Sequence, residues 1–216
     1  MHDEQAPAGA AAPEFAAPTA AVGAARCHTR ALFGAGLGFA LLALGSALLM
    51  GPPGAAGWDA ASRSTADVSV AFFLAAFSAA SLAQLWRSDA TRWLRRERRG
   101  LGLGFCAAFM VHLLAVIGRS VTGDPPGPLA VLGGGLGYLL VLAMALTSRD
   151  RAVAWLGQRR WQLLHGAGMY YLWTIFTLGY LARIQRHDAR ADHMVLFTLM
   201  VYAMLLRLYQ RLRVRA

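Results

Sequence analysis

The stretch RRGLGLGFCAAFMVHLLAVIG, residues 98–118, decides the fold: two arginines precede a long apolar run whose one strongly polar side chain is His112. A run of this length comes close to the roughly 20 residues that an α-helix needs to cross the ~30 Å hydrocarbon core of a bilayer. Outward from it, five more apolar runs are separated by GPPG at 51–54, GDPPGP at 123–128 and arginine-rich stretches. The predicted spans are about 31–50, 68–86, 101–118, 129–146, 162–182 and 193–209. The sequence therefore predicts an all-α integral membrane protein, a single bundle of six transmembrane helices.

The overall composition is that of a membrane protein. Hydrophobic residues make up 57% of the chain and charged residues 15%, and the mean hydropathy is +0.44, which is more apolar than a soluble domain can readily accommodate on its surface. A net charge of +10 is also typical of nucleic-acid-binding proteins. Here the basic residues are all arginine and flank the apolar runs, where the positive-inside rule places them. We therefore expect the lipid bilayer, and no nucleic acid, as a partner.

The distribution of arginine predicts the orientation of the chain. Sixteen of the 21 arginines lie near the two chain ends, in 87–99 and in 147–161, and five lie in the remaining segments. Because cytoplasmic segments carry the excess of arginine, both termini are predicted to be cytoplasmic. The predicted parts are a disordered Ala/Pro-rich cytoplasmic tail over 1–29, a six-helix domain over 30–210 and a basic cytoplasmic tail over 211–216.

Three histidines are candidate cofactor ligands. His112 and His165 lie within predicted spans, and His193 begins the last span from the outside. An ionisable side chain inside a membrane is a functional hypothesis by default. Small residues at every fourth position from Gly100 lead up to His112 on one helix stripe, which would leave room for a flat macrocycle and would equally allow close helix packing. The competing interpretation of both membrane histidines is an interhelical hydrogen bond, worth roughly 1 kcal/mol or less.

Two patches of sequence carry a family resemblance. The first is RRGLGL, residues 98–103, followed by His112. The second consists of LTS, LG and RWQLLH in that order, at 146–148, 156–157 and 160–165. Together they resemble the ferric reductase-like transmembrane family, and within it most the membrane haem subunits of bacterial periplasmic methionine sulfoxide reductase systems. The resemblance covers about residues 30–210 and implies b-type haem, with His112 and His165 at the positions of ligands to the haem iron.

The chain departs from the family pattern in one place. A second histidine of the fifth helix usually pairs with the histidine of the third, but that place holds Leu178 and Gly179 here. His112 lies about 20 Å from the arginines that begin its helix and His165 only about 7–8 Å, at ~1.5 Å per residue. Axial ligands must reach opposite faces of one iron, so these two are poor partners. Three alternatives stay open: a haem held by one histidine at a time, His193 as the partner of His112, and a divergent member without haem.

The function implied by the resemblance is transmembrane electron transfer through haem b, in a subunit of an oxidoreductase system of the bacterial cytoplasmic (inner) membrane. The glycine-rich runs lie inside apolar spans and not in a strand–turn–helix context, so the sequence contains no dinucleotide fingerprint and no NAD(P)H or flavin domain. A flavin cofactor stays an alternative that the sequence does not support. A separate redox partner is therefore implied, either an external reductase such as a molybdenum-containing one as acceptor, or a quinol or flavin donor.

Two other functions compete with electron transfer. A haem-free membrane scaffold or partner subunit that retains the family fold is motivated by the missing histidine. A small transporter or channel is disfavoured because no acidic residue is expected in the middle of a span and no pair of broken helices is evident. The aromatic residues of 162–182, Tyr180 among them, are expected to pack in the core and not to form an electron path.

Overall fold

The computed structural model describes residues 19–123, 125, 127–186 and 190–215, with side chains described between residues 28 and 213. Within these residues it is built of helices alone, which confirms the all-α class. The helices are α1 (Thr19–Met50), α2 (Ala55–Leu85), α3 (Asp89–Arg96), α4 (Arg98–Thr122), α5 (Pro128–Leu146), α6 (Asp150–Leu156), α7 (Gln158–Gln185) and α8 (Ala191–Arg215).

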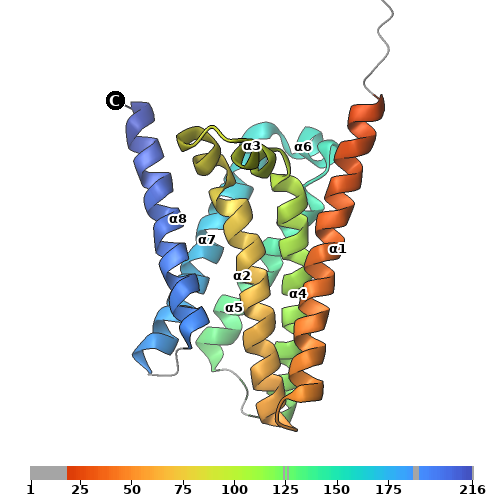
Figure 1. Ribbon diagram of the computed structural model, residues 1–216, viewed down its shortest axis with the longest axis vertical. Coiled ribbons are helices and arrows are strands. Elements are labelled where there is room, and N and C mark those ends of the chain that lie inside the picture. Colours follow the sequence, from red (N-terminus) through yellow and green to blue (C-terminus); the bar gives the residue numbers. More distant parts are fainter. Residues whose placement is uncertain (1–18, 124, 126, 187–189, 216) are drawn as a thin grey trace, which may run out of the picture.

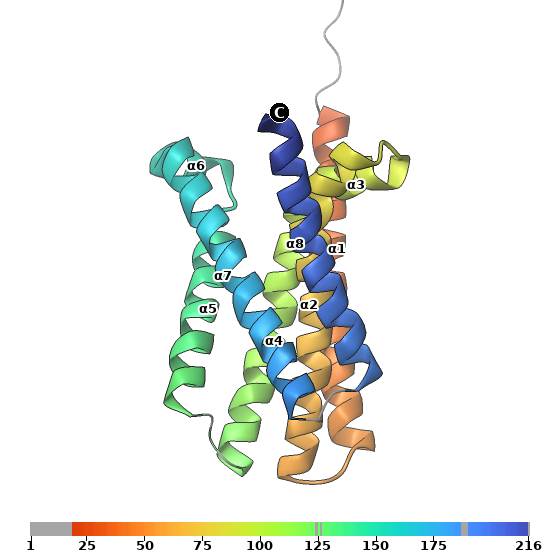
Figure 2. The same cartoon turned by 90° about the vertical axis from the view of Figure 1, so that its left-hand side faces the viewer.

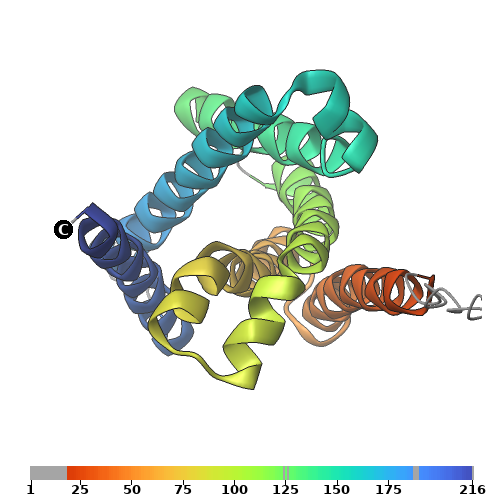
Figure 3. The same cartoon turned by 90° about the horizontal axis from the view of Figure 1, so that it is seen from above.

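Six long helices run between the two ends of a bundle, and the short helices α3 and α6 both lie at one end (Figure 1). We call this the arginine-rich end, because the segments 87–99 and 147–161 form it. Helix α1 starts and α8 finishes at the same end (Figure 1). Helix α7 runs from α6 to the opposite end, and α8 returns (Figure 2). Seen along the bundle, α1 packs outside α2 and α4, while α7 lies between α5 and α8 (Figure 3).

Within the described residues, five helices are long and apolar enough to cross a membrane, so the chain is a multi-pass membrane protein. They are His28–Met50, Ala55–Leu85, Arg98–Thr122, Pro128–Leu146 and Ala191–Arg213. The sixth predicted span corresponds to α7, which has 28 residues but is less apolar, because arginine, histidine and several tyrosines interrupt it. The count of six therefore stays a prediction for α7.

Helix α2 is longer than the predicted span 68–86, because it begins at Ala55. Its first turns contain charged residues that pair locally: Asp59 binds Arg63 four residues on and Arg119 of α4 at 3.2 Å. Hydroxyl side chains in these turns donate to carbonyls of the preceding turn. A 31-residue helix is about 46 Å long at 1.5 Å per residue, so it exceeds the hydrocarbon thickness.

The helices at the chain ends also reach further than expected. Helix α1 begins at Thr19, inside the predicted tail 1–29, and residues 1–18 of that tail lie outside the described residues. Helix α8 continues through Arg215, so most of the predicted tail 211–216 is helical.

Close packing of α1 against α4 explains the stripe of small residues that begins at Gly100. A Cβ added to Gly36 of α1 would lie 2.2 Å from the Gly104 carbonyl oxygen of α4, so the two backbones touch there. Ala108 of α4 and Ala40 of α1 are both fully buried in the same apolar cluster between the two helices. The small residues of this stripe therefore serve helix packing.

Candidate functional site

A cavity of about 460 Å³ lies between α2, α4, α5 and α7, in the half of the bundle away from the arginine-rich end. Its volume falls within the range of small-molecule and cofactor sites. Most of its lining is apolar, and Gly134, Gly135 and Gly179 leave open space where side chains would stand. The polar side chains that reach it are Asp67, His112, Ser120, Tyr138, Tyr180 and Arg183.

His112 is held on the α4 side of the cavity by Thr65 of α2, whose Oγ1 lies 3.1 Å from the imidazole Nδ1. The single hydroxyl hydrogen of Thr65 is directed at the Ala61 carbonyl oxygen, 2.7 Å away. The hydroxyl oxygen therefore accepts a hydrogen bond from Nδ1–H, which leaves the lone pair on Nε2. The ring also stacks on Phe109, with centroids 5.7 Å apart. Thr65 therefore orients the imidazole at the cavity with the lone pair on Nε2, and the ring also lies within hydrogen-bonding range of the Ser62 backbone.

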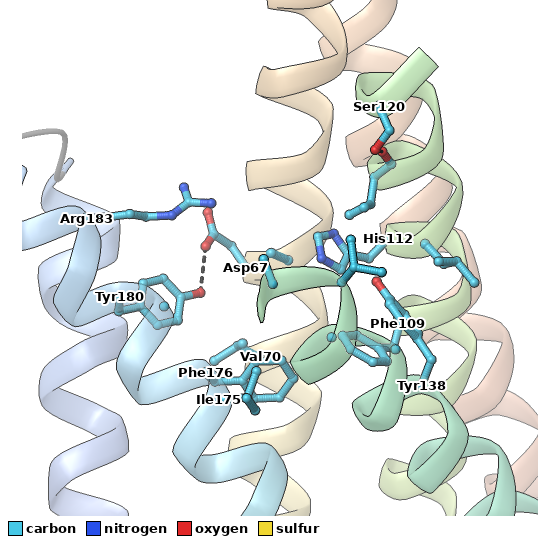
Figure 4. Close-up of a pocket in the computed structure, with 18 residues that line it drawn as sticks. Asp67, Val70, Phe109, His112, Ser120, Tyr138, Ile175, Phe176, Tyr180 and Arg183 are labelled. Carbon is cyan, nitrogen blue, oxygen red and sulfur yellow. Dashed lines mark hydrogen bonds between the residues drawn. The ribbon is translucent and has the colours of Figure 1, made fainter. Parts of the chain in front are cut away.

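The wall across the cavity carries a carboxylate–phenol pair. The Tyr180 hydroxyl donates to Asp67 Oδ1 at 2.8 Å, and Arg183 lies one turn beyond Tyr180 on α7 (Figure 4). Sequence reasoning missed both partners, because it placed Asp67 before the start of its span and treated Tyr180 as core packing. The spacing of Asp59, Arg63 and Asp67 at every fourth residue was a usable signal, since it indicates one helix face that continues across them.

His193 lies behind this wall and does not line the cavity. Its side chain is fully buried, its Nδ1 accepts from the Arg190 backbone N–H at 3.2 Å, and its Nε2 lies 3.4 Å from Arg183 Nη1. His193, Asp67 and Asp192 each place one potential ligand atom within 4.8 Å of the others. The Tyr180 hydroxyl and the Arg190 guanidinium already pair with these two carboxylates. This cluster therefore ties the start of α8 to the cavity wall.

His165 lies at the arginine-rich end, in the second turn of α7. Its Nε2 is 3.1 Å from Thr147 Oγ1, and its ring packs on Trp161 with centroids 4.4 Å apart. The Trp161 indole N–H donates to the Thr147 carbonyl oxygen at 3.0 Å. These contacts fasten the start of α7 to the end of α5.

A ring contact gives the distance between the two membrane histidines. Phe109 of α4 and Phe176 of α7 have centroids 5.6 Å apart. His112 lies three residues beyond Phe109, and His165 lies eleven residues before Phe176, toward the other end of the bundle. At ~1.5 Å per residue the two imidazoles are about 20 Å apart along the bundle. The cavity therefore contains His112 alone of the three candidate histidines.

Leu178 and Gly179 occupy the position at which the resembled family usually has its second histidine, and this position lies next to the cavity. Gly179 lines it, and a Cβ there would meet no atom within 4 Å. Leu178 points away from it, with 56% of its surface exposed. The wall opposite His112 therefore has space where a ligand side chain would otherwise stand.

Comparison with known proteins agrees with the sequence motifs. No family model and no solved structure matches the chain. A curated protein of Azospira oryzae, "Protein-methionine-sulfoxide reductase heme-binding subunit MsrQ", is 34% identical over an alignment of 102 residues. The chain is distantly similar to a haem-binding subunit. The alignment covers 38% of this chain and 42% of that relative, so the chain spans less than half of the relative's length.

Proposed function

We propose that this chain is a transmembrane electron-transfer subunit that holds one b-type haem in the cavity, with His112 as the protein ligand to the iron. The observation that carries the proposal is the orientation of His112: Nδ1 donates to Thr65, so that Nε2 offers its lone pair to a cavity of cofactor size. The haem-binding subunit to which the chain is similar supports the same cofactor.

The residues present fit such a group. The flat glycine surfaces at Gly134 and Gly135 leave room beside His112, and the remaining lining is mostly apolar. Arg183 and Ser120 are available at the rim for the two carboxylates that haem carries, since Arg183 has no carboxylate within 4 Å among the described residues.

Each side chain has a defined task in this proposal. Bound haem supplies one-electron chemistry. His112 would fix its position, and the hydrogen bond to Thr65 would orient the imidazole. The apolar lining excludes water and lowers the local dielectric, which are the means by which a protein tunes the reduction potential of a haem.

The proposed topology has six spans, with α7 as the sixth, and both termini in the cytoplasm of a bacterial cell with the chain in its inner membrane. Helix α7 joins α6 at the arginine-rich end to the start of α8 at the opposite end, which supports a crossing (Figure 2). The arginine-rich end would then be cytoplasmic by the positive-inside rule. The predicted regions 1–29, 30–210 and 211–216 are kept in this proposal, with α1 beginning at Thr19 inside the first and α8 extending through Arg215 into the last.

This orientation places the cavity nearer the external face. An acceptor outside the membrane, such as a separate reductase, would take electrons from it. A quinol or flavin protein would supply them. The absence of a dinucleotide fingerprint in this sequence supports a separate donor.

The test is the visible spectrum of the protein purified in mild detergent, oxidised and then reduced with dithionite. We expect a Soret band in the wild type, retention of that band in His165→Ala, and its loss in His112→Ala. The variant His193→Ala tests the third candidate ligand and is expected to retain haem. Loss of haem in His165→Ala or His193→Ala, with retention in His112→Ala, would overturn the assignment. A flat spectrum from folded protein after haem reconstitution would favour the haem-free scaffold instead.

A further inference from the structure

The wall that faces His112 contains no strong ligand for iron. Among the described residues that line the cavity, His112 is the only histidine, and none is cysteine or methionine. The lining also has two tyrosines: the Tyr180 hydroxyl donates to Asp67 at 2.8 Å, and the Tyr138 ring stacks on Phe109 on the His112 side, with centroids 4.3 Å apart. A protonated phenol is a poor iron ligand, so among the described residues of the lining only His112 would hold the iron strongly.

The same wall has free space next to α7. A Cβ on Gly179 would meet nothing within 4 Å, and its neighbours Ile175 and Phe176 are apolar. Such a wall suits a small uncharged molecule.

We propose that the cavity binds a small neutral diatomic molecule, of the class of CO and NO, on the side of the haem that faces Gly179. This inference rests on the proposed haem site and adds to it that the iron keeps a coordination position open to a ligand from outside the chain. The bond is coordinate, from the diatomic to the iron, and no atom of the protein is transferred.

The experiment is CO titration of the dithionite-reduced protein, followed by the shift of the Soret band. The wild type is expected to bind CO with a clear shift. Gly179→His is expected to place an imidazole in the cavity, to give sharp low-spin bands without CO, and to weaken CO binding at least tenfold. Leu178→His is the matched control, because the neighbouring side chain is 56% exposed on the outer surface of the helix. It is expected to bind CO as the wild type does.

The outcomes separate this inference from the proposed function. Absence of a Soret band in the wild type removes the haem site and this inference with it. A haem with sharp low-spin bands that gives no CO shift leaves the haem site standing and overturns the open position. A spectrum that becomes high-spin in Tyr180→Phe would identify Tyr180 as a sixth ligand and would also overturn it. The wild-type titration decides the question even if Gly179→His fails to fold.

Discussion

Thr65 and His112 meet between α2 and α4, and their hydrogen bond determines which imidazole nitrogen is available to a ligand. Thr65 is fully buried, and its own hydrogen is committed to the Ala61 carbonyl. A buried hydroxyl with this pair of contacts can act on His112 only as an acceptor. The proposed haem chemistry therefore depends on a residue that does not line the cavity.

Thr65→Val tests this dependence with little change in shape. The valine cannot accept from Nδ1–H, so the imidazole loses its orientation, and haem affinity is expected to fall by about 10–100-fold. The loss of the hydrogen bond is expected to reduce stability by about 0.5–1.5 kcal/mol. Haem titration followed at the Soret band measures the first effect, and thermal unfolding in detergent the second.

Thr174→Val is the control for that measurement. Thr174 is exposed on α7 and donates only to the Tyr170 carbonyl one turn earlier, at 3.0 Å. The Thr174→Val substitution should therefore leave the haem affinity unchanged. Equal affinities of Thr65→Val and wild type would show that the orientation of His112 does not depend on Thr65.

At the scale of elements, the contact between α1 and α4 contributes to the position of α4, the helix that carries His112. Gly36 and Gly104 allow the two backbones to touch, because a side-chain carbon at either position would overlap the opposing helix. Membrane helices lack a hydrophobic driving force toward one another, so close packing of small residues is a main source of their association. This packing therefore contributes to the position of α4 against α1.

Gly36→Ala and Gly38→Ala form a matched pair on α1. The methyl group at 36 would lie 2.2 Å from the Gly104 carbonyl oxygen, whereas the methyl group at 38 would meet nothing within 4 Å. Gly36→Ala is expected to cost about 1–3 kcal/mol through overpacking, and Gly38→Ala less than about 0.5 kcal/mol, as for an ordinary surface change. Thermal unfolding in detergent compares them. Equal melting temperatures would rule out the backbone contact.

At the scale of the whole molecule, the open question is whether α7 crosses the membrane. The arrangement of its neighbours is consistent with the proposed crossing: α6 lies at the arginine-rich end, α8 starts at the opposite end, and α7 joins them (Figures 1 and 2). Its lower apolar content is offset by contacts inside the bundle. The Trp173 indole donates to the Met200 carbonyl at 2.8 Å, and the Tyr171 hydroxyl donates to the Gly133 carbonyl at 2.8 Å.

Labelling of single cysteines from outside the cell tests the crossing. Ala154→Cys on α6 and Gln185→Cys at the end of α7 are both exposed positions, introduced into a chain whose Cys27 and Cys106 are replaced by serine. A maleimide that cannot pass the membrane is expected to label position 185 and not position 154 in intact cells. Both positions should react with the maleimide after the cells are lysed. Reaction of both positions, or of neither, in intact cells would place the two ends of α7 on one side.

The sequence by itself determined the all-α class, the membrane location and five of the spans, because these depend on local quantities. The length of an apolar run and the breakers that end it can be read without knowledge of any partner. Its motifs also led to the resemblance that the similarity to a haem-binding subunit confirms. His112 became a candidate ligand by the same means, as a polar residue inside a span, and its role stays a prediction.

The tertiary structure alone decided what surrounds His112. Asp67 and Tyr180 are far apart in the chain, and only the packing of α2 against α7 joins them. The same packing separates His165 from the cavity and places Gly179 in its wall. Each of these facts depends on which faces of different helices meet. A one-dimensional pattern does not encode that arrangement, because many pairings of apolar helices bury similar surfaces, and close contacts such as Gly36 with Gly104 select among them.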